Sequence, residues 1–190
     1  MIIISQNAAN YNVKFPKDCV FRINLAWCNS LAELEEILKR HKEHEVFVDL
    51  PINRVKPPNN SYSLNELFPI IKHNKQIKYF AVSNVETASD LTKFQKSIPE
   101  WVTIIPKIES PKGIENIQEI TESLNYAKKY VMLDHDDLFS AIVKSHESYH
   151  VFQNHIKNLV NFCQENNISL LRTVGVIFSD DEKRTTQYVK

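Results

Sequence analysis

The chain has 190 residues, the length of one domain with a sizeable core, and we expect residues 1–190 to form a single domain. It carries 23 Lys and Arg against 23 Asp and Glu, so no charge excess indicates a nucleic acid or an anionic membrane as partner. Hydrophobic residues make up 43% of the chain, and no run approaches the roughly 18 apolar residues that span a bilayer. The composition therefore predicts a globular protein without a nucleic-acid or membrane role.

The N-terminus has no basic segment before its short apolar run, so we expect no signal peptide. The three cysteines, Cys19, Cys28 and Cys163, have no CxxC spacing, and their odd number argues against a disulfide framework. Both features predict a reducing, cytoplasmic location. Gly113 and Gly175 are the only glycines, which excludes the glycine-rich phosphate loops of nucleotide-binding domains.

Short apolar runs rich in β-branched residues recur along the chain. Runs of this length that are apolar throughout are typical of parallel strands buried on both faces. We expect strands at residues 20–25, 46–50, 77–82, 102–108, 130–133 and 169–174, with an earlier one at 2–4.

Helix start signals follow most of these runs. Ser30 and Ser63 each stand three residues before a glutamate, the spacing of a capping box. Thr87 or Ser89 begins the next helix, and Pro111 stands at the first helical position of another. The alternation predicts an α/β fold, as either an open doubly wound sheet or a closed barrel. In both, chemistry takes place at the carboxyl ends of the strands.

Polar residues stand at those strand ends. They are Arg22, Asn24, Asp49, Ser83, Lys107, Glu109, residues 134–137 and Thr173. Lys107 and Glu109 share one face of their strand, because strand side chains repeat every second residue. Two carboxylates from adjacent strands are typical of a Mg²⁺ site. We therefore expect a metal and an anion to bind side by side at this end of the sheet.

Several segments resemble the central domain of pyruvate kinase. Residues 107–120, KIESPKGIENIQEI, resemble that family's KIE…G…N…EI segment, and residues 131–138, VMLDHDDL, resemble its next strand. Residues 21–25 resemble its arginine and asparagine strand, residues 48–49 with Arg54 the strand and turn after it, and residues 81–83 its serine strand. Thr173 stands where the family keeps a threonine. Residues 106–110 are also similar to citrate lyase β-subunits and 2-oxo-acid aldolases, which belong to the same phosphoenolpyruvate/pyruvate superfamily.

The resemblance implies a (β/α)₈ TIM-barrel-like fold, incomplete at about seven strands and without a lid or C-terminal domain. It implies Mg²⁺ or Mn²⁺ as cofactor, with Glu109 and Asp137 as metal ligands. The catalytic residues that it implies are Lys107, Thr173 and Arg22. The substrate-binding residues that it implies are Asn24, Asp49, Ser83 and Asp136.

The implied function is that of a metal-dependent enzyme that binds pyruvate, phosphoenolpyruvate or a related 2-oxo acid and stabilises its enolate. The reaction would be C–C lysis, aldol addition or a phosphoenolpyruvate-linked transfer. A non-catalytic or degenerate pyruvate kinase-like binding protein is the alternative. We expect no ATP formation, because few residues separate Arg54 from Ser63, where pyruvate kinase inserts its nucleotide-covering lid. A second departure from that family is Asp136, which stands where the family has a glycine.

A second motif predicts a different chemistry. Residues 146–150, HESYH, match the HExxH motif of zinc hydrolases, in which two histidines on one helix bind zinc. We expect a long helix from about residue 139 to 165, which would carry this motif. No third ligand is evident at a suitable spacing, so an exposed helix surface is the favoured interpretation.

Finally, an incomplete barrel leaves apolar strand edges, and we expect a homo-oligomer.

Overall fold

The computed structural model describes residues 2–6, 15–52, 58, 60–148 and 150–172, and every structural statement below concerns these residues. Seven parallel strands form one sheet whose order in space is their order in the chain. They are β1 (Ile3–Ser5), β2 (Val20–Asn24), β3 (Glu45–Leu50), β4 (Ile77–Val82), β5 (Thr103–Ile108), β6 (Tyr130–Leu133) and β7 (Ser169–Arg172). A doubly wound sheet reverses its strand order at one point, and this sheet does not.

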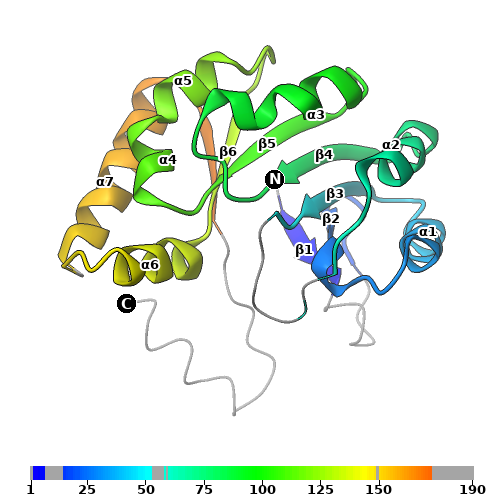
Figure 1. The fold of residues 1–190 in the computed structure, drawn as a ribbon. Coiled ribbons are helices and arrows are strands. Elements are labelled where there is room, and N and C mark those ends of the chain that lie inside the picture. The colour runs from blue at the N-terminus through cyan, green and yellow to red at the C-terminus, as the bar shows by residue number, and fades with distance from the viewer. Residues whose placement is uncertain (1, 7–14, 53–57, 59, 149, 173–190) are drawn as a thin grey trace.

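Helices connect the strands. They are α1 (Leu31–Arg40), α2 (Leu64–His73), α3 (Thr92–Ser97), α4 (Pro111–Glu115), α5 (Ile117–Glu122), α6 (His135–Lys144) and α7 (His150–Glu165), with 3₁₀ turns η2 (Leu25–Trp27) and η3 (Ala88–Leu91). Figure 1 shows the strands curling into a half-barrel, with the helices arranged around its outside. Because all strands are parallel, their carboxyl ends meet at one rim of this half-barrel.

The two faces of the sheet have different cores. The outer-face core combines strand residues such as Phe21, Val48 and Phe80 with helix residues such as Leu34 and Leu67. The inner-face core is smaller, and its buried members all come from strands: Val20, Phe47, Ala81, Ile105, Tyr130 and Met132. Among the residues described, helices therefore cover only the outer face of the sheet.

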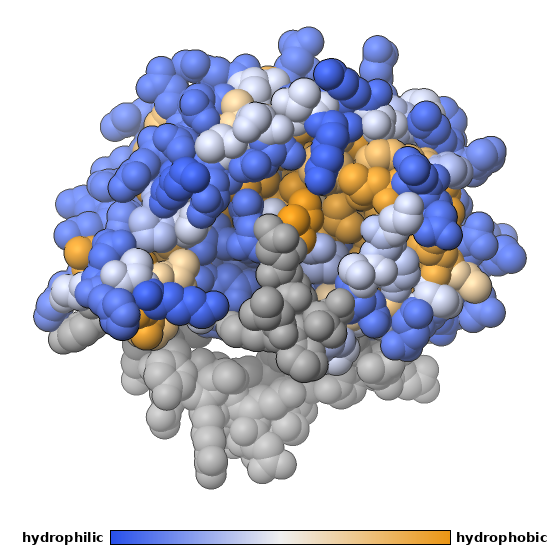
Figure 2. All heavy atoms as spheres, viewed as in Figure 1, coloured by the Kyte–Doolittle hydropathy of each residue, from blue (hydrophilic) through white to orange (hydrophobic). Residues whose placement is uncertain are grey.

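Most of the helix surface that faces the viewer in Figure 2 is hydrophilic, and hydrophobic residues show mainly in the middle of that view. This distribution is expected where each helix buries one apolar stripe against the sheet. In α1, for example, Leu34, Ile37 and Leu38 are buried, and Ser30 Oγ accepts a hydrogen bond from Glu33 N at 3.1 Å. No helix in the described part of the chain is long and apolar enough to cross a membrane.

The strand predictions are confirmed to within two residues, including the short first strand, although residues 173 and 174 lie outside the described ranges. The prediction of one helix from residue 139 to 165 is wrong. Helix α6 ends at Lys144 and α7 begins at His150, because His146 adopts a left-handed backbone conformation with φ of 57°. Ser63 precedes α2 as predicted, but its side chain accepts no capping hydrogen bond.

Candidate functional site

Asp49 and Lys107, two of the polar residues predicted from the strand ends, lie on the inner face of the sheet. Asp49 lies two residues after Phe47, and Lys107 two residues after Ile105, and both of those apolar residues belong to the inner-face core. Because side chains alternate along a strand, Asp49 and Lys107 continue the same face toward the carboxyl rim. On the inner face, these polar side chains therefore lie nearer the carboxyl rim than the apolar side chains of the inner-face core.

A buried charge pair connects β2 and β3. Arg22 donates to Asp49 Oδ2 through Nη2 and also through Nε, at 3.2 Å. The Asp49 side chain is 1% exposed and the Arg22 side chain 15%. Burying a carboxylate is costly unless it is paired, and the guanidinium supplies that pairing.

Lys107 joins this pair to a second carboxylate. Its Nζ lies 2.8 Å from Glu109 Oε1 and 3.6 Å from Asp49 Oδ1, and it donates to Ser83 Oγ at 3.1 Å. All four side chains are buried. One ammonium group is thus surrounded by two carboxylates and a hydroxyl that come from three neighbouring strands and their ends.

The pKa values follow from burial and from these charges. Burial opposes ionisation of Asp49, but the positive charges of Lys107 and Arg22 prevail and lower the pKa of its carboxyl group. Burial likewise opposes the charge on Lys107, but Asp49 and Glu109 prevail and raise its pKa. For Glu109, burial is the dominant cause, and it raises the pKa above the ordinary value despite the neighbouring lysine. A cation beside Glu109 would favour its ionised form.

The second oxygen of Glu109 is held by the loop after β4. Asn84 N donates to Glu109 Oε2 at 2.7 Å, and the Asn84 side chain donates to Ile52 O at 2.6 Å. Asn84 has a left-handed backbone with φ of 53°, which asparagine tolerates better than most residues. In this conformation, the Asn84 N–H group points to the Glu109 carboxylate. Asn84 was not singled out from the sequence.

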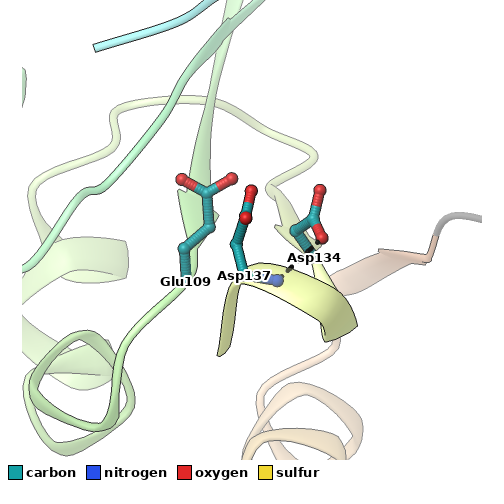
Figure 3. A group of neighbouring side chains, drawn as sticks. All are labelled: Glu109, Asp134 and Asp137. Carbon is teal, nitrogen blue, oxygen red and sulfur yellow. Dashed lines mark hydrogen bonds between the residues drawn. The ribbon is translucent and has the colours of Figure 1, made fainter. Parts of the chain in front are cut away.

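Three carboxylates gather beside this group. Glu109 follows β5, Asp134 is the N-cap of α6, and Asp137 lies in the first turn of that helix. One carboxylate oxygen of each lies within 4.8 Å of the others, and Figure 3 shows the three groups extending to the same side. Asp134 Oδ1 also accepts from Asp137 N at 3.3 Å, so helix capping positions one member of the cluster beside another.

A cleft of about 230 Å³ is lined by Glu109 and Asp137 of this cluster, but not by Asp134. Six of the residues predicted for the site line it: Asn24, Asp49, Ser83, Lys107, Glu109 and Asp137. Its other lining residues include Asn84, Glu86 and Lys144, which the sequence analysis missed. Asn24 also caps η2, since its Oδ1 accepts from Ala26 N at 3.0 Å.

The residues after Glu109 in the segment that resembles KIE…G…N…EI have a supporting role. Asn116 Nδ2 donates to Glu86 O at 2.8 Å, and Glu119 Oε1 accepts from Ala88 N at 3.1 Å. A Cβ atom on Gly113 would lie 2.7 Å from Val85 O, so only glycine fits there without a shift of the backbone. These residues fix the loop at 84–88, which in turn holds Glu109 through Asn84.

Three predicted site residues are not placed in the cleft. Asp136 is exposed on α6 and does not line it, because the helix begins at His135 and turns Asp136 away from the neighbouring Asp137. Arg22 does not line the cleft either, and its described contact is with Asp49. Thr173 lies outside the described residues, so its role stays a prediction.

The HExxH hypothesis does not fit the backbone. His146 lies in the turn between α6 and α7, and His150 begins α7, so the two histidines do not share a helix. The only group of three potential metal-ligating residues in the described ranges is Glu109, Asp134 and Asp137. The three cysteines are free, in agreement with their odd number and spacing, and they are buried.

Comparison with solved structures gives 308 matching chains, so the architecture is widespread and does not by itself identify a function. One of them is the crystal structure of RipC from Yersinia pestis, with 14% identity over 88% of this chain and 75% of that chain and a TM-score of 0.59. At this identity, the likeness concerns the fold alone. No protein-family model and no curated protein matches the chain.

Proposed function

We propose that this chain is a divalent-metal-dependent enzyme of the phosphoenolpyruvate/pyruvate superfamily. Its substrate is pyruvate, phosphoenolpyruvate or a related small 2-oxo acid, and it stabilises the enolate of that acid. The observation that carries the proposal is a buried lysine beside Glu109 and Asp137 in one cleft at the carboxyl ends of parallel strands, with Asp134 close to both carboxylates. Such a rim is where enzymes with sheets of this kind place their chemistry.

The donor set fits Mg²⁺ or Mn²⁺. Both ions prefer oxygen ligands, and Mg²⁺ is commonly held by one or two carboxylates while water and substrate oxygens complete its shell. Glu109 and Asp137 line the cleft and would hold the ion, with Asp134 as a third donor beside them. When bound, the cation supplies a Lewis acid that polarises the oxygens of the acid and favours its enolate.

The residues around the ion have separate roles. Lys107 places a positive charge beside the developing enolate, and Ser83 Oγ accepts one of its hydrogen bonds. Asn24 and Lys144 line the cleft and can bind a second anionic group of the substrate. The cleft is smaller than the roughly 300–1,000 Å³ of sites for drug-sized ligands, which favours a small acid.

We propose that the half-barrel is an incomplete (β/α)₈ barrel. The sequential strand order, the curl of the sheet and the helices on its outer face support this assignment. An inner-face core made of strand residues also agrees with it, since barrels of this type fill their interior with layers of strand side chains.

Exchange of the methyl protons of pyruvate in D₂O tests the proposed chemistry without knowledge of a second substrate. We expect Mn²⁺- or Mg²⁺-dependent loss of the methyl proton signal, because an enolate exchanges that proton with solvent. Lys107→Met should slow the exchange by about 10²-fold or more, as is typical when a group that stabilises developing charge is removed.

The same measurement separates the enzyme from a binding protein. Oxalate binding in the presence of Mn²⁺ without any proton exchange would contradict enolate chemistry and favour a non-catalytic acid-binding protein. Absence of both Mn²⁺ and oxalate binding would overturn the proposed site.

A further inference from the structure

The ammonium group of Lys107 has two carboxylate neighbours, and they lie at unequal distances from it. Its Nζ lies 2.8 Å from Glu109 Oε1 and forms a close ion pair with it, although Oε1 accepts no hydrogen bond within the described residues. Its distance to Asp49 Oδ1 is 3.6 Å, longer than a hydrogen bond. Ser83 Oγ accepts the remaining contact at 3.1 Å. Glu109 is thus the main anionic partner of Lys107.

Glu109 is also a proposed metal ligand, so its carboxylate would be shared between two cations. The Glu109 side chain is 2% exposed, and water can do little to screen a dication from an ammonium at this depth. The carboxylate's other oxygen already accepts from Asn84 N. A cation that binds Glu109 would therefore weaken the contact between Glu109 and Lys107.

Asp49 is placed to accept the ammonium. Its Oδ2 accepts from Arg22, whereas its Oδ1, like Glu109 Oε1, accepts no hydrogen bond within the described part of the chain and lies 3.6 Å from Lys107 Nζ. Because Asp49 is buried and paired with Arg22, its carboxylate is fixed in place. A small movement of the lysine terminus toward Oδ1 would turn the 3.6 Å contact into a hydrogen bond.

We propose that Asp49 is a positioning residue that takes over the ammonium of Lys107 when a divalent cation binds Glu109. The inference rests on the proposed function, since it requires that cation. It explains why an acid-binding cleft contains a buried aspartate behind its lysine. Asp49 keeps the lysine inside the cleft, where Ser83, a neutral partner, could not balance its charge.

A double-mutant cycle on Mn²⁺ affinity tests this role, with calorimetric titration of wild type, Asp49→Asn, Lys107→Met and the double variant. Lys107→Met should strengthen Mn²⁺ binding, because it removes the competing cation. Asp49→Asn should weaken Mn²⁺ binding at least about fivefold in wild type but less than about twofold in the Lys107→Met background, which measures the coupling between the two side chains.

A spectroscopic measurement on the wild-type protein needs no variant of Asp49. The side-chain ammonium signal of Lys107 in ¹⁵N-labelled protein is identified by its absence from Lys107→Met. We expect this signal to shift and stay visible in saturating Mg²⁺, because the group moves to another buried acceptor. Its disappearance on addition of Mg²⁺ would show release to solvent and would overturn the inference, even if Asp49→Asn did not fold.

The outcomes separate the inference from the function on which it rests. If Asp49→Asn weakens Mn²⁺ equally in both backgrounds, Asp49 acts on the ion through its own charge, and only the positioning role is overturned. If wild type binds no Mn²⁺, both the positioning role and the proposed function are overturned.

Discussion

Buried charges dominate the site at the scale of single residues, and Asp49 is the most deeply buried of them. Its folded-state pKa is lowered below the ordinary 3.8, because Lys107 and Arg22 outweigh the cost of burial. A lowered folded-state pKa adds stability at pH values above 3.8, and this stability is lost as the pH falls through the folded-state pKa. Asp49 is thus expected to support both folding and the lysine position.

Asp49→Asn should lower the free energy of unfolding by about 3 kcal/mol at pH 7, because it leaves a buried cation without one of its partners. The difference from wild type should shrink as the pH falls from about 4 through the lower folded-state pKa of Asp49, below which the wild-type carboxyl group is protonated as well. Urea unfolding at several pH values measures this difference. Glu35→Gln on the exposed side of α1 is the control. A difference that is independent of pH would contradict the ion-pair explanation.

Burial also controls the cysteine thiols. It raises the pKa of Cys28 and of Cys163 to about 11, and it raises the pKa of Cys19 as well. A thiol with such a pKa is about one part in a thousand thiolate at pH 8, and the thiolate is the reactive form. We expect an aromatic disulfide reagent to label none of the three thiols within minutes in the native protein, and all three in urea. Rapid labelling without denaturant would contradict their burial.

At the scale of elements, the loop at 84–88 connects the recognisable sequence motif to the site. Gly113 lies under this loop and meets Val85 O, while Asn84 at its start holds Glu109. The motif residues after Glu109 therefore act mainly on the position of the loop. This role could not be predicted from the sequence, because strand periodicity gives no information on which loop a helix contacts.

Gly113→Ala should lower stability by roughly 1–3 kcal/mol, the usual cost of forcing extra atoms into a packed site. It should also weaken Mn²⁺ binding, because a displaced Val85 carries Asn84 away from Glu109. Thermal unfolding and Mn²⁺ titration measure the two effects. Glu115→Ala, at an exposed position of the same helix, is the matched control. Unchanged Mn²⁺ affinity in a destabilised Gly113→Ala protein would show that the loop does not control the metal site.

The predicted elements differ in how well local sequence defines them. Strands were predicted within two residues, because apolar runs such as 77–82 and 130–133 coincide with burial on both faces. The prediction of one helix across residues 139–165 missed a break, because the polar run 144–148 fits an exposed helix face as well as the turn in which His146 is left-handed. Hydrophobic spacing alone does not reveal a change of direction of this kind.

At the scale of the whole molecule, the site depends on which strands the curl of the sheet brings together. Lys107 and Glu109 could be paired from the sequence because they lie on one strand, and Asp49 and Ser83 from the rule on strand ends. The sequence could not show whether Asp134 or Asp136 lies beside the carboxylate of Asp137. The answer depends on the residue at which α6 begins. Because the helix begins at His135, Asp134 is its N-cap and Asp136 is exposed.

The outer strands of the described sheet, β1 and β7, each pair with one neighbour only. Open strand edges favour association, so we still expect a homo-oligomer. Light scattering coupled to gel filtration should give a mass of at least twice the 22.2 kDa of one chain at tens of micromolar. A mass of one chain across a range of concentrations would contradict this expectation.

A divalent cation at Glu109 and Asp137 is the central feature of the proposed site, and calorimetric titration with Mn²⁺ tests it. Wild type should bind one Mn²⁺, and Glu109→Gln should weaken that binding at least about tenfold, the loss typical of an altered metal site. Asp136→Asn, which removes an exposed carboxylate next to Asp137, should leave the affinity within about twofold, as for an exposed charge. Equal Mn²⁺ affinity in wild type and Glu109→Gln would contradict the proposed metal site.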